Sequence, residues 1–139
     1  MSLLRRFFSG ISTYPSVNME AAKAKALEEI RSNPVVVFSK SGCPYCRNTK
    51  NLLRSLGVEG KDKLKVLELD EMSDGPDIQA ALAEGFGSEE GIVYEQAQRT
   101  VPNIFIGGTH IPGGNDGFVK KSKNEPAELE KMLKDAGAL

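Results

Sequence analysis

The chain has 139 residues, the size of one globular domain that can bury its own core. Its 18 basic and 19 acidic residues are mixed along the sequence and leave a formal net charge of −1, so no basic surface is expected to bind a nucleic acid. No apolar run approaches the ~20 residues that cross a bilayer, and we expect no membrane partner.

The first residues have the composition of a targeting segment. Residues 1–18 contain two Arg, two Phe and several Ser and Thr, and the first acidic residue is Glu20. This composition fits a mitochondrial transit peptide, with a disordered tail as the alternative. Initiation at Met19 would yield a form without this leader. We therefore expect a leader over 1–18, one domain over 19–139, and a cytoplasmic protein with a mitochondrial form if the leader directs import.

The spacing of apolar residues predicts helices that alternate with strands. In chain order we expect a helix over 20–32, a strand over 35–38, a helix over 47–56, a strand over 65–69, a helix over 77–84, strands over 103–106 and 109–111, and a helix over 126–136. Residues 85–98, rich in Gly and Glu, are expected to form a loop. The first two strands should be parallel because a helix lies between them, and Gly107-Gly108 should turn the last two into a hairpin. The pattern predicts an α/β fold with a four-stranded mixed sheet flanked by helices on both faces.

The two cysteines lie in one short motif, Cys43-Pro44-Tyr45-Cys46. Cys43 stands where a strand and a turn lead into a helix, and unpaired backbone N–H groups and the helix dipole favour a thiolate there. Cys46 lies one helical turn further on and is placed to attack a mixed disulfide on Cys43. A lone CxxC pair beside a strand–helix pattern is typical of a redox site in a reducing compartment.

Neighbouring cations are expected to assist the thiolate. A helix end contributes ~0.3–1 kcal/mol, less than the ~1.36 kcal/mol of one pKa unit, so we expect Lys40 and Arg47 to add to it.

The alternative to a redox site is a pair of structural buried thiols. Two Cys and His110, the one histidine, leave the usual four zinc ligands incomplete, and we expect no metal. His110 itself is expected at the surface of an edge strand.

The chain resembles a dithiol glutaredoxin in three segments: residues 40–46, the sequence Thr100-Val101-Pro102 and a later Gly-Gly loop. The resemblance covers about residues 20–137, and Cys-Pro-Tyr-Cys is highly specific for that family. It implies a thioredoxin-like fold and glutathione as co-substrate. It also implies a cis peptide bond before Pro102, the alternative being a trans turn proline, and pairing of the Val101 backbone with glutathione.

The resemblance also implies a glutathione site. The residues assigned to it are Lys40, Tyr45, Arg99, Thr100, Val101, Pro102, Gly113, Gly114, Asn115 and Asp116. Lys40 takes the family position for the glycine carboxylate, Arg99 assists it, and Tyr45 is expected over the mouth of the site. Without a gap, Asp116 accepts from the γ-glutamyl amine; with a one-residue insertion, Gly117 would stand there. Pro112 departs from the family pattern, which has glycine at this position.

The function implied by the resemblance is a glutathione-dependent reduction of glutathione mixed disulfides and protein disulfides. Cys43 is the expected nucleophile and Cys46 the resolving thiol. The expected partners are glutathione, glutathionylated or disulfide-containing proteins and, indirectly, glutathione reductase, with the chain acting as a monomer. Two alternatives remain open. A thioredoxin would carry a different dipeptide between its cysteines, and a dimeric carrier could hold a [2Fe–2S] cluster through Cys43 of each subunit and two glutathiones.

Overall fold

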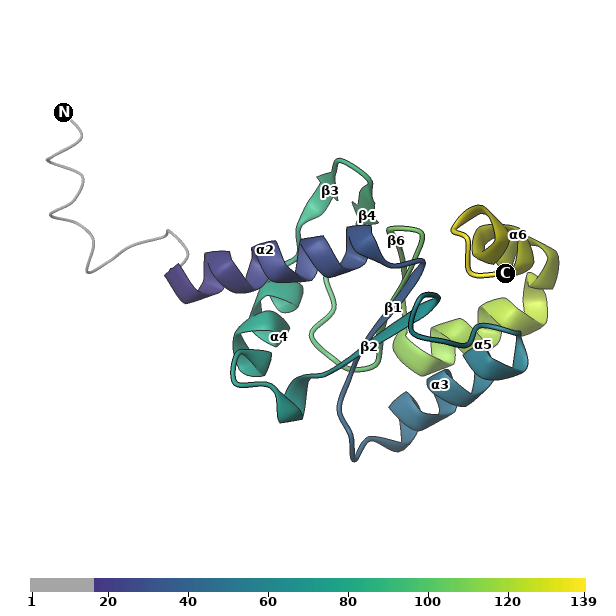
Figure 1. Ribbon diagram of the computed structural model, residues 1–139, viewed down its shortest axis with the longest axis horizontal. Helices are drawn as coiled ribbons and strands as arrows, with labels where there is room; N and C mark the ends of the chain where they lie inside the picture. The colour runs from purple at the N-terminus through teal and green to yellow at the C-terminus, as the bar shows by residue number, and fades with distance from the viewer. Residues whose placement is uncertain (1–16) are drawn as a thin grey trace, which may run out of the picture.

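The computed structural model describes residues 17–139 (Figure 1). The elements, in chain order, are α2 (Val17–Ser32), β1 (Val35–Ser39), α3 (Pro44–Ser55), β2 (Leu64–Glu68), the 3₁₀ turn η2 (Leu69–Glu71), α4 (Gly75–Glu84), β3 (Gly87–Glu89), β4 (Ile92–Tyr94), β5 (Asn103–Ile106), β6 (Thr109–Ile111), α5 (Gly114–Asn124) and α6 (Pro126–Asp135). Residues 1–16 of the expected leader lie outside the described residues. Its last two residues, Val17 and Asn18, already belong to α2.

The described residues form one mixed sheet of six strands in the order β2-β1-β5-β6-β4-β3. As predicted, β1 pairs parallel with β2, and β5 and β6 form a hairpin. The expected four strands were too few, because residues 85–98 are not a loop but contain a second hairpin, β3–β4. This hairpin joins the sheet through β4, which runs parallel to β6 with Val93 opposite Thr109.

The second hairpin and one helix escaped prediction because their apolar patterns are short. In β4, buried Ile92 and Tyr94 flank Val93, which is 40% exposed, and three residues of alternation do not separate a strand from a loop. Helix α5 is mostly polar and contributes Phe118 to the core. The predicted final helix corresponds to α6.

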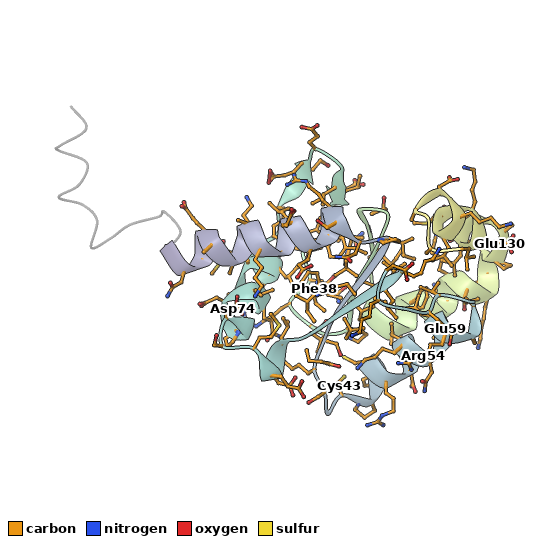
Figure 2. The ribbon with its side chains drawn as sticks, viewed as in Figure 1. Phe38, Cys43, Arg54, Glu59, Asp74 and Glu130 are labelled. Atoms are coloured by element: carbon orange, nitrogen blue, oxygen red, sulfur yellow. The ribbon has the colours of Figure 1, made fainter. Side chains whose placement is uncertain are left out.

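The sheet separates two hydrophobic cores. Helices α2 and α4 cover one face, and α3, α5 and α6 cover the other (Figure 1). Because neighbouring strand residues point to opposite faces, Val36 and Phe38 of β1 pack in the first core and Val35 and Val37 in the second. Strand β1 is thus buried on both faces. Its carboxyl end holds the turn that leads to Cys43, which lies where α3 begins (Figure 2).

His110 lies inside the molecule, contrary to the expectation of a surface residue. The β3–β4 hairpin extends the sheet beyond β6, so β6 is not an edge strand. The His110 side chain is 7% exposed and packs edge-on against Tyr94, with ring centroids 4.6 Å apart. Burial lowers the pKa of His110 to about 4, so the imidazole is neutral at physiological pH.

Within residues 17–139, no helix combines the length and the apolar character needed to span a bilayer.

Candidate active site

Cys43 is the N-cap residue of α3, and Pro44 is the first helical residue. The Cys43 backbone is extended, with φ −88° and ψ 117°, and its N–H donates to the Lys40 carbonyl at 3.1 Å. The Cys46 N–H donates to Cys43 Sγ at 3.4 Å, so the sulfur takes the capping role that a side-chain oxygen usually has. The predicted position of Cys43 at a helix N-terminus is confirmed.

The two thiols have different environments. Cys43 is half-buried, whereas Cys46 is fully buried. Burial is the largest influence on the Cys43 pKa and raises it, but hydrogen bonds, chiefly from Cys46, and the charge of Lys50 together outweigh burial and lower this pKa. At Cys46 burial prevails over hydrogen bonds from the Lys40 backbone and the Ser39 hydroxyl, and the pKa is raised. Cys43 is therefore the more acidic thiol.

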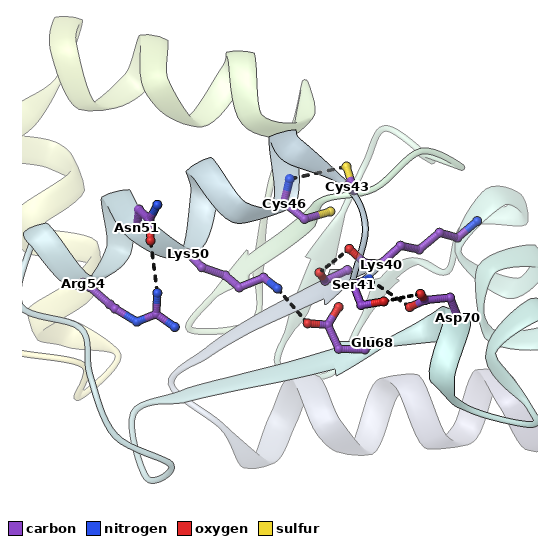
Figure 3. Close-up of polar contacts among 10 residues, drawn as sticks. Lys40, Ser41, Cys43, Cys46, Lys50, Asn51, Arg54, Glu68 and Asp70 are labelled. Atoms are coloured by element: carbon purple, nitrogen blue, oxygen red, sulfur yellow. Dashed lines mark hydrogen bonds and ion pairs between the residues drawn. The ribbon is translucent and has the colours of Figure 1, made fainter.

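The cation that acts most on Cys43 comes from the second turn of α3. Lys50 Nζ forms an ion pair with Glu68 Oε2 at the end of β2, at 2.7 Å (Figure 3). Both side chains are mostly shielded, at 16% and 24% exposure, so their charges are screened less than surface charges are. Lys40 and Arg47 were the cations expected to assist the thiolate, whereas Lys50 is the cation whose charge stands among the main influences on the Cys43 pKa.

The Thr100–Pro102 segment leads into β5 beside the turn that precedes Cys43. In the antiparallel pair of β1 and β5, Phe38 lies opposite Asn103. Ser39, which follows Phe38, and Pro102, which precedes Asn103, therefore lie at the same end of this pair. The peptide bond between Val101 and Pro102 is cis, as the resemblance implied. Pro102 is buried, Val101 is half-buried and Thr100 is exposed.

The glycine loop before α5 lies against this segment. Gly113 and Gly114 have φ values of 90° and 61°, which side chains with a Cβ rarely adopt. A Cβ on Gly114 would lie 3.5 Å from the Pro102 carbonyl oxygen, which shows how closely the two segments approach. Helix α5 is tied to α3 by the Thr49 hydroxyl, which donates to Asn115 Oδ1 at 2.9 Å in the interior.

The structure thus brings together the three segments that were assigned to glutathione from the sequence: 40–46, 99–102 and 113–116. Tyr45, at 59% exposure, and Asp116, in the first turn of α5, are exposed. Asn115 was assigned to glutathione, but its side chain is 9% exposed and its Oδ1 accepts from the Thr49 hydroxyl in the interior. Arg99 is exposed, and its carbonyl accepts from Gln79 Nε2 at 3.0 Å.

Between Val17 and the C-terminus, no group of three or more His, Cys, Asp or Glu residues could hold a metal ion.

A comparison with known proteins decides the family. The glutaredoxin family model matches residues 35–111, more than half of the chain. The chain belongs to the glutaredoxin family. A glutaredoxin of Ricinus communis is 48% identical over 118 residues, which cover 85% of this chain and 99% of the relative. Glutaredoxin-C1 of Arabidopsis thaliana is 46% identical over 87% of this chain and 83% of its own.

Solved structures agree with this assignment. The crystal structure of a buckwheat glutaredoxin–glutathione complex is 40% identical, covers 90% of this glutaredoxin and 99% of its own chain, and superposes with a TM-score of 0.73. The fold is the expected thioredoxin-like α/β fold, with the sheet extended by β3 and β4.

Two side chains beside the site were not predicted, although a spacing signal existed for both. The charge of Lys50 lowers the Cys43 pKa, and the Asp70 carboxylate accepts from the Ser41 N–H at 2.9 Å. Lys50 follows Cys43 by seven residues and therefore lies on the same face of α3. Asp70 follows β2 by two residues, as Ser41 follows β1, and parallel strands bring such positions together at one edge of the sheet.

Proposed function

We infer that this glutaredoxin is a glutathione-dependent thiol–disulfide oxidoreductase that reduces glutathione mixed disulfides and protein disulfides. The observation that carries the inference is the pairing of an acidic, half-buried Cys43 thiol with a buried Cys46 at the start of one helix. The relative whose structure is a complex with glutathione supports glutathione as the co-substrate.

The first route uses Cys43. Its thiolate attacks the glutathione sulfur of a glutathionylated protein, the protein–glutathione S–S bond breaks, and the protein thiolate leaves and takes up a proton. Cys43 now carries glutathione in a mixed disulfide. A second glutathione thiolate attacks the bound glutathione sulfur, which releases glutathione disulfide and restores the Cys43 thiolate. One S–S bond is exchanged for another in each step, and the net reaction consumes one free glutathione: the glutathionylated protein and glutathione give the protein thiol and glutathione disulfide.

The second route adds Cys46 and serves protein disulfides. Cys43 forms a mixed disulfide with one protein sulfur, and Cys46 loses its proton and attacks Cys43 Sγ. The protein is released as a dithiol, and the Cys43–Cys46 disulfide forms. Two glutathiones then reduce this disulfide, and glutathione reductase returns glutathione disulfide to the reduced form. Burial of Cys46 keeps its thiol protonated until that step, which limits premature closure of the disulfide.

We assign glutathione to the surface shared by the three converging segments. The Lys40 and Arg99 side chains provide positive charge for the glycine carboxylate, and the Val101 backbone pairs with the cysteinyl residue. At the other end, the first helical hydrogen bond of α5 runs from the Gly117 N–H to the Gly113 carbonyl, at 3.0 Å. The N–H groups that precede it, at the positive end of the α5 dipole, suit the γ-glutamyl carboxylate. Asp116 accepts from the γ-glutamyl amine.

The test is a coupled assay with a glutathionylated peptide, glutathione, glutathione reductase and NADPH. We expect turnover in the wild type, loss in Cys43→Ser and retention in Cys46→Ser. With a protein disulfide as substrate, Cys46→Ser should lose activity as well. Turnover with thioredoxin reductase and none with glutathione would contradict the proposal and favour a thioredoxin.

Two further properties belong to this proposal. We expect a monomer, which sedimentation of the reduced protein tests. We also propose a cytoplasmic protein with a mitochondrial form directed by residues 1–18. Fluorescent fusions of the full chain and of a chain beginning at Met19 test this, since only the first should enter mitochondria.

A further inference from the structure

We propose that Gln98 is a positioning residue for glutathione recognition, because its side-chain amide holds the peptide group that presents the Val101 N–H. Gln98 lies outside the three segments assigned to glutathione. The inference rests on the proposed function, since Val101 belongs to the segment assigned to glutathione.

The side chain of Gln98 spans the segment 100–102. Its Nε2 donates to the Thr100 carbonyl and to the Pro102 carbonyl, each at 2.9 Å. A primary amide carries two N–H donors, and both are used here. One side chain therefore fixes the carbonyls on either side of Val101.

Fixing the Thr100 carbonyl also orients the Val101 N–H. The peptide group between Thr100 and Val101 is planar, and in the trans form its C=O and N–H point in opposite directions. Since the Thr100 carbonyl points to the Gln98 amide, the Val101 N–H points to the opposite side of the segment. The assigned pairing of glutathione with the Val101 backbone depends on this direction.

Gln98 also lies beside the other assigned segment. A Cβ on Gly114 would lie 4.0 Å from Gln98 Nε2 and 3.5 Å from the Pro102 carbonyl oxygen. The Gln98 amide therefore borders both the cis-proline segment and the glycine loop. A shift of this amide would change the spacing between two of the three segments.

The backbone of Gln98 is held by two buried side chains, Tyr94 at the end of β4 and Asn103 at the start of β5. Its N–H donates to Tyr94 Oη at 2.7 Å, and its carbonyl accepts from Asn103 Nδ2 at 3.1 Å. Tyr94 Oη in turn donates to the Leu82 carbonyl at 2.7 Å, and both Tyr94 and Asn103 are 1% exposed. The buried end of β4 thus fixes the backbone position of Gln98. The Gln98 side chain in turn fixes the positions of the Thr100 and Pro102 carbonyls.

The test compares two mixed disulfides of the same peptide, one with glutathione and one with 2-mercaptoethanol. The second has no peptide backbone beyond its sulfur and cannot pair with Val101. The second-order rate constant for consumption of each is measured in the full chain carrying Cys46→Ser, with Gln98→Met and Gln98→Glu added. Gln98→Met keeps the length of the side chain without donors, and Gln98→Glu places acceptors against the two carbonyls. Gln96→Met, at an exposed glutamine of the same connection, is the matched control.

For Gln98→Met we expect the rate constant with the glutathione disulfide to fall roughly tenfold, the effect of losing two hydrogen bonds, one of them partly buried, that orient the binding segment. Gln98→Glu should fall at least as far. The rate constant with the 2-mercaptoethanol disulfide should change less than about twofold, because the Cys43 thiolate is unaffected. Gln96→Met should match its parent with both substrates.

An equal fall with both disulfides would overturn the inference, since it would indicate damage to Cys43 or to the fold. Unchanged rates with both would overturn it as well. The proposed function fails by a different result: a parent chain that consumes the glutathione disulfide no faster than the 2-mercaptoethanol disulfide. That outcome is visible before any Gln98 variant is made.

Discussion

Ser41 donates both its backbone N–H and its hydroxyl to the carboxylate of Asp70, the former at 2.9 Å (Figure 3). The contact joins the turn that follows β1 to η2, the 3₁₀ turn that follows β2. The last residues of these two parallel strands, Ser39 and Glu68, lie opposite each other. The contact fixes the turn that precedes Cys43 at the edge of the sheet. The orientation of the nucleophile therefore depends on a carboxylate outside the CxxC motif.

Asp70→Asn should loosen this turn. An amide has one acceptor oxygen where the carboxylate has two, so only one of the two Ser41 hydrogen bonds can persist in the same form. We expect kcat/KM in the glutathione-coupled assay to fall roughly two- to tenfold, because the nucleophile loses part of its alignment. Asp135→Asn, on the distant α6, is the control, and a similar fall in that variant would contradict the prediction.

The same contact should weaken in acid. The Ser41 hydroxyl, followed by the Ser41 N–H, lowers the pKa of Asp70 because both donate to the charged form. A lowered folded-state pKa means that this stabilisation is present above the pKa of the unfolded carboxyl and is lost as the pH falls through the folded value. Hydrogen exchange of the Ser41 amide should therefore accelerate in that acidic range, relative to its intrinsic rate. A constant protection factor would count against the contact.

The two thiols should differ in reactivity. At pH 7 iodoacetamide should alkylate Cys43 in a Cys46→Ser chain at least about tenfold faster than Cys46 in a Cys43→Ser chain, because the thiolate reacts and Cys46 is buried. The alkylation rate of Cys43 should also reach half its maximum at a lower pH. Replacement of Cys46 by alanine instead of serine removes a donor to Cys43 and should raise the Cys43 pKa. Equal rates for the two thiols would refute the assignment of the nucleophile.

Lys50→Met should raise the Cys43 pKa, because the ammonium charge favours the thiolate. We expect the alkylation rate of Cys43 at pH 6 to fall roughly two- to fivefold, the scale of a partly shielded charge pair. Arg47→Met is the matched control: Arg47 is exposed on the same helix and should have the smaller effect. A larger effect of Arg47→Met would restore the assignment made from the sequence.

Tyr94→Phe should destabilise the fold. The hydroxyl donates to the buried Leu82 carbonyl and accepts from the partly buried Gln98 N–H, each at 2.7 Å, and its loss removes both hydrogen bonds. We expect the free energy of unfolding in urea to fall by about 1–3 kcal/mol. Tyr45→Phe removes an exposed hydroxyl and should change it by less than about 0.5 kcal/mol. Equal effects of the two variants would show that the buried network contributes nothing.

Much of the fold follows from short-range patterns. The run of apolar residues in β1, the helical spacing in α2 and α6, and the Gly107-Gly108 turn each depend on neighbours within a few positions, and each was predicted close to its observed bounds. The location of Cys43 at a helix N-terminus has the same origin. A strand, a turn and Pro44 in succession leave little choice for where the helix begins.

The β3–β4 hairpin and the interior position of His110 were not predictable in this way. Three residues of alternation in β4 carry little information, and β4 joins the rest of the sheet through its pairing with β6 and packs its Tyr94 into the core. The same long-range contacts cover His110. Since these partners are distant in the chain, their effect on residues 85–98 exists only in the folded molecule.

The site shows the same division. The nucleophile could be inferred from residue types and spacing, because a CxxC pair at the start of a helix favours a thiolate. The segments assigned to glutathione followed from the resemblance to dithiol glutaredoxins. The contacts that orient these groups could not be inferred from the sequence. They are the contacts of Lys50 with Glu68, of Asp70 with Ser41 and of Gln98 with Thr100. Two of these join different elements, and the third depends on a tyrosine in a hairpin that the sequence did not reveal. Hydrogen bonds and ion pairs act over a few ångströms, so their partners are set by how the sheet and helices pack.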